Sequence, residues 1–134
     1  MAISAATLSR QINRRLLTKM IDDSTIRSII EQYERFGWEL RRVLLTPELQ
    51  NKLGNISEDL FKGVEIDAGD IDAAWFTRAS KNGGTAWELR ALQESPFALI
   101  EVVDPDISNE ELELTLSGIE QQLRERRHST TNGN

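Results

Sequence analysis

Apolar residues recur every three or four positions along the first third of the chain. The first stripe consists of Leu8, Ile12, Leu16 and Met20. The second stripe consists of Ile26, Ile29, Ile30, Tyr33 and Phe36. This spacing gathers apolar side chains on one face of an α-helix. We therefore predict two amphipathic helices, with an N-cap within 22–24 for the second and Gly37 at its C-terminal end. The pattern leaves open whether the two helices are separate.

The next segment predicts a strand followed by two short helices. The sequence "WELRRVLL" at 38–45 has the bulky and β-branched residues typical of strands. Thr46 is a suitable N-cap and Pro47 suits the first helical position, so a short helix is predicted from there. A second short helix is predicted within 57–63. The acidic segment after it is predicted to turn at 68–69.

Alternating and apolar segments then predict three more strands. Residues 73–80 and 85–93 flank "KNGG" at 81–84, which is the strongest hairpin signal in the chain. The segment "FALIEVVD" at 97–104 is apolar on both faces. Because strands that are buried on both faces have this composition, we predict that it lies in the interior of the sheet.

The last element is predicted to be a helix. Ser108 and Glu111 form a capping box, and apolar residues follow at helical spacing. Residues 128–134 are predicted to be a disordered polar tail, and 1–127 a single domain. The element order predicts a two-layer α+β domain. In it, an antiparallel sheet of about four strands carries the N-terminal and C-terminal helices on one face.

Each tryptophan, at positions 38, 75 and 87, is followed three residues later by an arginine. In the hairpin, a two-residue turn would pair Trp75 with Arg90, whereas a longer turn with Gly83 in the left-handed region shifts the pairing by one. We favour the longer turn, because it gathers Trp75 and Trp87 on one apolar face. The other register would bury arginine or glutamate without a partner, at a cost of several kcal/mol.

On this interpretation all three tryptophans lie in the core, and the opposite sheet face is open and carries mixed charge. The simpler explanation is a solvated face with Arg–Glu pairs. The alternative is an interface, since arginine and aromatic residues are enriched at interfaces. The candidate interface residues are Arg41, Phe76, Arg78, Glu88 and Arg90.

The composition of the chain argues against several classes of function. The net charge is −6, with eight Lys/Arg against five Asp/Glu in residues 1–45 and eight against seventeen in the remainder. An excess of acid argues against nucleic-acid binding, which normally shows a clustered basic footprint. The chain has no cysteine. It also has no secretion-signal pattern at its start and no apolar run of membrane-spanning length, so we expect a cytoplasmic protein.

Candidate chemistry is sparse. The acidic segment Glu65–Asp72 offers oxygen ligands for a hard cation but does not match a known calcium loop, and an acidic turn is the simpler interpretation. The single histidine, His128, lies in the predicted tail. No phosphate loop or nucleophile motif is present. We therefore expect no cofactor, and the sequence favours a protein without catalytic activity.

Together these observations predict a small, acidic interaction module. It would bind a protein partner or a second copy of itself, through the open sheet face or the N-terminal helix. The alternative is a small-molecule-binding or metal-binding protein, or a carboxylate-based enzyme, with a pocket near Asp67–Asp72. The sequence identifies no ligand and no partner.

Overall fold

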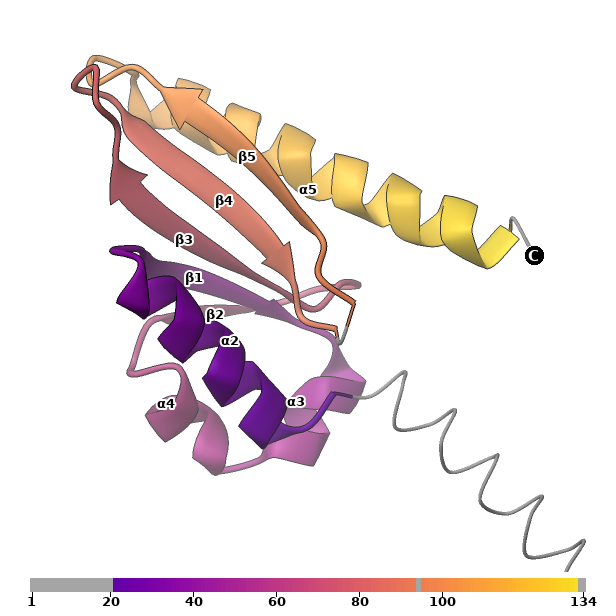
Figure 1. The fold of residues 1–134 in the computed structure, drawn as a ribbon. Helices are drawn as coiled ribbons and strands as arrows, with labels where there is room; N and C mark the ends of the chain where they lie inside the picture. Colours follow the sequence, from indigo (N-terminus) through magenta and orange to yellow (C-terminus); the bar gives the residue numbers. More distant parts are fainter. Residues whose placement is uncertain (1–20, 94, 133–134) are drawn as a thin grey trace, which may run out of the picture.

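The computed structural model describes residues 21–93 and 95–132 (Figure 1). In chain order its elements are α2 (Asp23–Arg35), β1 (Glu39–Leu45), α3 (Pro47–Leu53), α4 (Ile56–Leu60), β2 (Glu65–Ala68), β3 (Ala73–Ala79), β4 (Thr85–Ala91), β5 (Ala98–Val103) and α5 (Asn109–Asn132). The α+β class is confirmed. The helix predicted from Leu8 to Met20 lies outside the described residues.

Local capping signals in the sequence define the helix starts. Asp22 accepts a hydrogen bond from the Thr25 backbone N–H at 2.9 Å and caps α2. Thr46 caps α3, with Pro47 in the first turn as predicted. At α5, the Ser108 hydroxyl accepts from the Glu111 N–H at 3.1 Å, which confirms the predicted cap. Each cap satisfies backbone donors that the helix itself leaves free.

The five strands form one mixed sheet in the order β2-β1-β3-β4-β5. β2 runs parallel to β1, and all other neighbours are antiparallel. The strand that the sequence did not predict is β2, which lies in the expected acidic turn. Its four residues place Glu65 and Asp67 at alternate positions and lack the β-branched run by which strands are recognised.

Helices cover both faces of the sheet, so the domain has three layers and not the predicted two (Figure 1). On one side α2, α3 and α4 pack over Val43, Ala74 and Phe76. On the other side α5 packs over Trp75 and Leu89. The prediction that the terminal helices share a face is wrong for α2 and α5. β3 explains why, because it is buried on both sides and both sides therefore need cover.

The β3–β4 hairpin has the predicted longer turn. Trp75 pairs with Leu89 and Thr77 with Trp87, which places both tryptophans on one face. The turn is closed by a hydrogen bond from the Ser80 N–H to the Gly84 carbonyl at 2.9 Å. Gly83 adopts φ +89°, a left-handed conformation that favours glycine. The hydrophobic pattern therefore sets the register, as expected.

Trp38 does not join the other two tryptophans. The pairing of β1 with β3 shifts between Leu40 and Arg42, so Arg41 is the extra residue of a β-bulge. Trp38 is half-buried on the α2 side of the sheet, whereas Trp75 and Trp87 lie on the α5 side. The prediction of one shared tryptophan core is therefore wrong.

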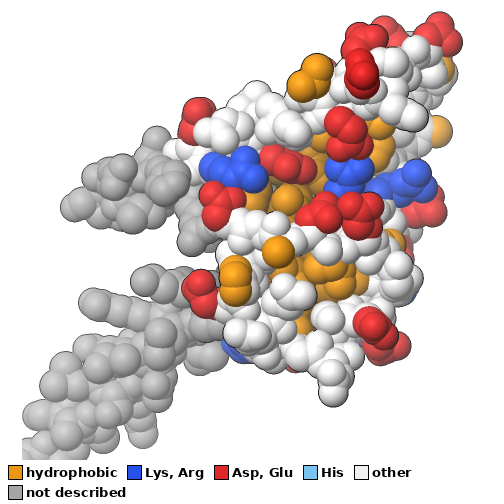
Figure 2. All heavy atoms as spheres, turned by 180° about the vertical axis from the view of Figure 1, so that it is seen from behind, with side chains coloured by type: hydrophobic (Ala, Val, Ile, Leu, Met, Phe, Trp, Pro, Cys, Tyr) orange, Lys and Arg blue, Asp and Glu red, His pale blue; other side chains and the backbone are white. Residues whose placement is uncertain are grey.

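Side-chain contacts hold α5 against the sheet. Glu113 forms an ion pair with Arg42 of β1 at 3.0 Å, and Arg124 pairs with Asp70 at 2.6 Å. Figure 2, which views the molecule from the α5 side, shows acidic and basic side chains interleaved across this surface. The helix continues to Asn132, into the segment predicted to be disordered, because no glycine or proline interrupts it after Gly118 until Gly133.

Candidate functional site

The sheet face that carries α2 is covered over β1 and β3 but not over β5. The strand register defines rows across this face, and one row contains Leu40, Phe76, Glu88 and Ile100. Phe76 is fully buried, while Ile100 at the other end of the row is 57% exposed. We call the part of this face that β4 and β5 form the β4–β5 face; on it Ala86 and Arg90 of β4 are buried, whereas Ile100 and Val102 of β5 are exposed. Its residues are Ala86, Glu88, Arg90, Ala98, Ile100 and Val102.

Tyr33 of α2 lies at the edge of the part of the sheet that α2 covers. Its ring stacks on Phe76 with 4.1 Å between ring centroids. Its hydroxyl donates a hydrogen bond to the Glu88 carboxylate. Burial, followed by the hydrogen bond and the negative charge of Glu88, raises the pKa of Tyr33 above its ordinary value. The neutral phenol therefore ties α2 to β4 at neutral pH.

This raised pKa is directly measurable, because Tyr33 is the only tyrosine in the chain. We expect tyrosinate absorbance to appear at a higher pH in the folded protein than in denaturant, where the pKa is about 10. The unfolded chain ionises first, so this contribution to stability is present below pH ~10 and is lost as the pH rises further. Glu88→Gln should lower the folded pKa. An identical titration in the folded and denatured states would contradict the Tyr33–Glu88 contact.

The two arginines of the hairpin have structural partners. Arg90 is buried, its guanidinium donates to the carbonyls of Ala91 and Gln93, and burial lowers its pKa. Arg78 is exposed, lies over the Trp38 ring at 4.6 Å and donates to the Phe36 carbonyl at 3.2 Å. Both arginines therefore contact the chain's own backbone and rings, and among the described contacts neither forms the Arg–Glu pair that the simpler interpretation of this face expected.

The five predicted interface residues are not all on one open surface. Arg78 and Glu88 lie on the α2 side, at or beside the β4–β5 face, while Phe76 is in the core beneath α2. Arg41 is exposed at the bulge of β1, on the far side of β3 from β4. An entirely open face is therefore wrong, because α2 covers half of it. The use of the remaining residues as an interface stays a prediction.

Sequence reasoning missed the most exposed apolar residues of this face. Ile100 and Val102 are 57% and 54% exposed. They belong to the segment predicted to be an interior strand, but β5 is the edge strand of the sheet. The available signal was its position, since Pro96 and Pro105 bracket the segment and prolines are common beside edge strands.

The backbone of β5 also presents N–H and C=O groups that pair with no other strand of the described residues. The Ala91 N–H donates to the Phe97 carbonyl at 2.9 Å, so Phe97 faces β4. Backbone groups alternate in direction along an antiparallel strand. The N–H and C=O groups of Ala98, Ile100 and Val102 therefore point away from β4, toward the open edge. The same three residues place their side chains on the β4–β5 face.

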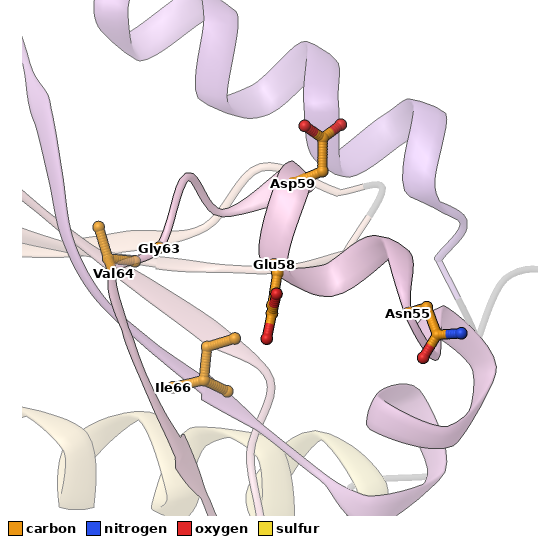
Figure 3. Close-up of a pocket in the computed structure, with 6 residues that line it drawn as sticks. All are labelled: Asn55, Glu58, Asp59, Gly63, Val64 and Ile66. Carbon is orange, nitrogen blue, oxygen red and sulfur yellow. The ribbon is translucent and has the colours of Figure 1, made fainter.

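A shallow pocket lies at the opposite end of the sheet, between α4 and β2. Its volume is about 650 Å³, and its lining residues are Asn55, Glu58, Asp59, Gly63, Val64 and Ile66. Figure 3 shows the Glu58 side chain directed toward Ile66, whereas Asp59 points away from it. Its ionisable lining residues are the two carboxylates Glu58 and Asp59, of which only Glu58 is directed toward the apolar side chains, and no histidine, lysine or arginine lines it.

The acidic segment does not gather its carboxylates into a ligand set. Asp70 pairs with Arg124 of α5. Asp72 accepts hydrogen bonds from the Thr46 N–H at 2.7 Å and the Thr46 hydroxyl at 3.3 Å, which orients the cap of α3. In the described part of the chain, no three His, Cys, Asp or Glu side chains are placed to hold a metal ion. The pocket between α4 and β2 is lined by Ile66 but by none of Asp67, Asp70 and Asp72, so a pocket near Asp67–Asp72 stays a prediction.

Among the helices of the described residues, none is long and apolar enough to cross a membrane. Contacts and exposure thus single out the β4–β5 face and the free edge of β5. Comparison with known proteins finds no matching family model, curated protein or solved structure, so these residues alone carry the functional argument.

Proposed function

We propose that this protein is a non-catalytic interaction module that binds an extended protein strand at the edge of β5. One observation carries the proposal: β5 has the composition of an interior strand but lies at the sheet edge, with Ile100 and Val102 more than half exposed. Edge strands are usually kept short, charged or covered, because an open edge invites pairing. β5 carries a single charged residue, Glu101, in six.

Strand addition would use both the backbone and the side chains of β5. The outward-pointing N–H and C=O groups of Ala98, Ile100 and Val102 supply hydrogen bonds to any extended chain, which gives affinity without sequence preference. The side chains of Ile100 and Val102 favour apolar residues at alternate positions of the partner. Burying the exposed halves of both would contribute about 2 kcal/mol.

The ionisable groups beside β5 support a binding function over a catalytic one. Glu88 accepts the Tyr33 hydrogen bond, and Arg90 is bound to backbone carbonyls. Both groups therefore hold the chain's own structure, and neither is presented to a substrate. Their role on this face is to anchor α2 and the end of β4, which keeps β5 in a fixed position.

Selection from a displayed library of random peptides tests this function. We expect the wild-type chain to enrich peptides with apolar residues at alternate positions. The double variant Ile100→Lys/Val102→Lys should lose this enrichment, because lysine places a charge where the partner must bury apolar surface. Leu114→Lys is the matched control, since Leu114 is 74% exposed on α5 and lies away from β5.

Two results would contradict the proposal. The first is the absence of any enriched peptide on the wild-type chain at a concentration where that chain is monomeric. The second is equal enrichment on the wild type and on the double variant with both variants folded, as judged by circular dichroism. Loss of enrichment with Leu114→Lys as well would show that the bound surface is not confined to β5.

A further inference from the structure

Resting on the proposed function, we infer that the partner strand is β5 of a second copy of this chain. The two strands pair antiparallel about a twofold axis at Ile100, and the two five-stranded sheets become one continuous sheet. β5 then has a hydrogen-bonded neighbour on each side, and this fits a strand with only one charged residue, since open edges usually carry charge. The edge that one copy leaves open is closed by the same edge of the other.

In this arrangement the outward N–H and C=O groups of β5 form hydrogen bonds with the same groups of β5 in the second copy. In an antiparallel pair, the residues that exchange hydrogen bonds face each other directly. With Ile100 on the axis, Ala98 of each copy faces Val102 of the other, and the two Ile100 residues face each other. Every residue of β5 whose N–H and C=O point outward is then paired. The side chains of these pairs are all apolar and all lie on the β4–β5 face.

Charge and proline select this register over its neighbours. A shift by two residues toward the C-terminal end would place the two Glu101 side chains directly opposite each other, which is unfavourable. A shift by two in the other direction would place Val102 opposite Pro96, which has no N–H to donate. The register centred on Ile100 avoids both and sets Glu101 opposite Leu99.

The other edge of the sheet limits the assembly to two copies. That edge is β2, which has only four residues and carries Glu65 and Asp67. A short acidic edge is a poor partner for β5, whose one charged residue is also acidic. Pairing between β5 and β2 of different copies, which would build an open fibre, is therefore disfavoured. Pairing of β5 with β5 closes on itself.

Single cysteines test both the pairing and its register, because the natural chain has no cysteine. In the proposed dimer the two Ile100 Cα atoms lie about 5.5 Å apart, within disulfide reach. The Ala98 Cα atoms of the two copies lie about 14 Å apart, beyond that reach. Ile100→Cys should therefore form a covalent dimer on mild oxidation. Ala98→Cys should do so only when mixed with Val102→Cys.

Ser117→Cys, at an exposed position on α5, measures random oxidation. A yield for Ile100→Cys no higher than that of Ser117→Cys would overturn the pairing. Cross-linking of Ala98→Cys with itself above that level would overturn the register. Both outcomes are read on the folded 134-residue chain, by mass spectrometry of the oxidised samples.

Sedimentation equilibrium provides a test without cysteine. The wild type should show a monomer–dimer equilibrium as its concentration rises. Val102→Pro removes an outward N–H and leaves the hydrogen bonds to β4 intact, so we expect the dissociation constant to rise about tenfold or more. Val102→Thr keeps the N–H and should retain the dimer. A wild type that stays monomeric at every concentration overturns self-pairing. If that monomer still selects peptides, the proposed function stands with a different partner.

Discussion

Phe76→Ala is expected to destabilise the protein by about 3–5 kcal/mol, the usual cost of removing a buried aromatic side chain. Phe76 is fully buried between β3 and α2, and its ring stacks against Tyr33. Its loss would leave a cavity under α2 and would remove the surface on which Tyr33 is held in reach of Glu88. A domain of this size has a free energy of unfolding of about 5–15 kcal/mol, so this substitution would remove a large share of it.

Chemical denaturation of the wild type and of Phe76→Ala measures this effect. Phe36→Ala is the matched control, because Phe36 is 64% exposed at the end of α2 and its truncation should change stability by less than about 0.5 kcal/mol. A clearly larger loss of stability for Phe76→Ala than for Phe36→Ala is expected if α2 covers this face of the sheet. It is not expected if the face is open, as the sequence suggested. If Phe76→Ala were as mild as Phe36→Ala, α2 would not lie over β3.

Trp75→Ala should lower the free energy of unfolding by at least as much, about 3–5 kcal/mol. This substitution affects the packing of α5, on the other face of the sheet. Trp75 has no exposed surface, and its ring meets Trp87 edge to face at 5.8 Å between centroids. Its indole N–H donates to Glu120 of α5 at 2.8 Å. Truncation would remove this anchor of α5 and leave a cavity against Leu116.

Trp38→Ala provides the comparison for Trp75→Ala. Trp38 is half-buried and contacts Tyr33 and Arg78 at the rim of the other layer. We expect its truncation to cost clearly less free energy of unfolding than that of Trp75. Equal costs, measured by the same denaturation experiment, would mean that Trp38 and Trp75 are equivalent core residues, as the interpretation of the sequence had them.

Features that depend on a few adjacent residues were predictable from the sequence. The caps of α2, α3 and α5 follow from side chains that satisfy free N–H groups within the same turn. The hairpin register follows from the cost of placing charged residues in a core. The cause of each cap lies within one helical turn, and the cause of the register lies within one hairpin, so the rest of the fold is not needed to predict either.

The layer arrangement and the candidate site depend on contacts between distant segments. The bulge at Arg41 inserts one residue without a mark in the composition, yet it moves Trp38 to the other side of the sheet. The cover over Phe76 comes from the position of α2, which local patterns do not specify. Composition predicted β5 as an interior strand, and this is wrong, because the strand order within one chain places β5 at an edge and leaves Ile100 57% exposed.

The division of the tryptophans between two layers gives each layer its own optical signal. Trp75 and Trp87 lie under α5, whereas Trp38 lies beside Tyr33 at the end of α2. In chains that retain either Trp38 alone or the Trp75–Trp87 pair, intrinsic fluorescence would follow the unfolding of one side of the sheet at a time. Coincident transitions would mean that the sheet couples both helical layers into one cooperative unit. Separate transitions would show that α5 can leave while the α2 side persists.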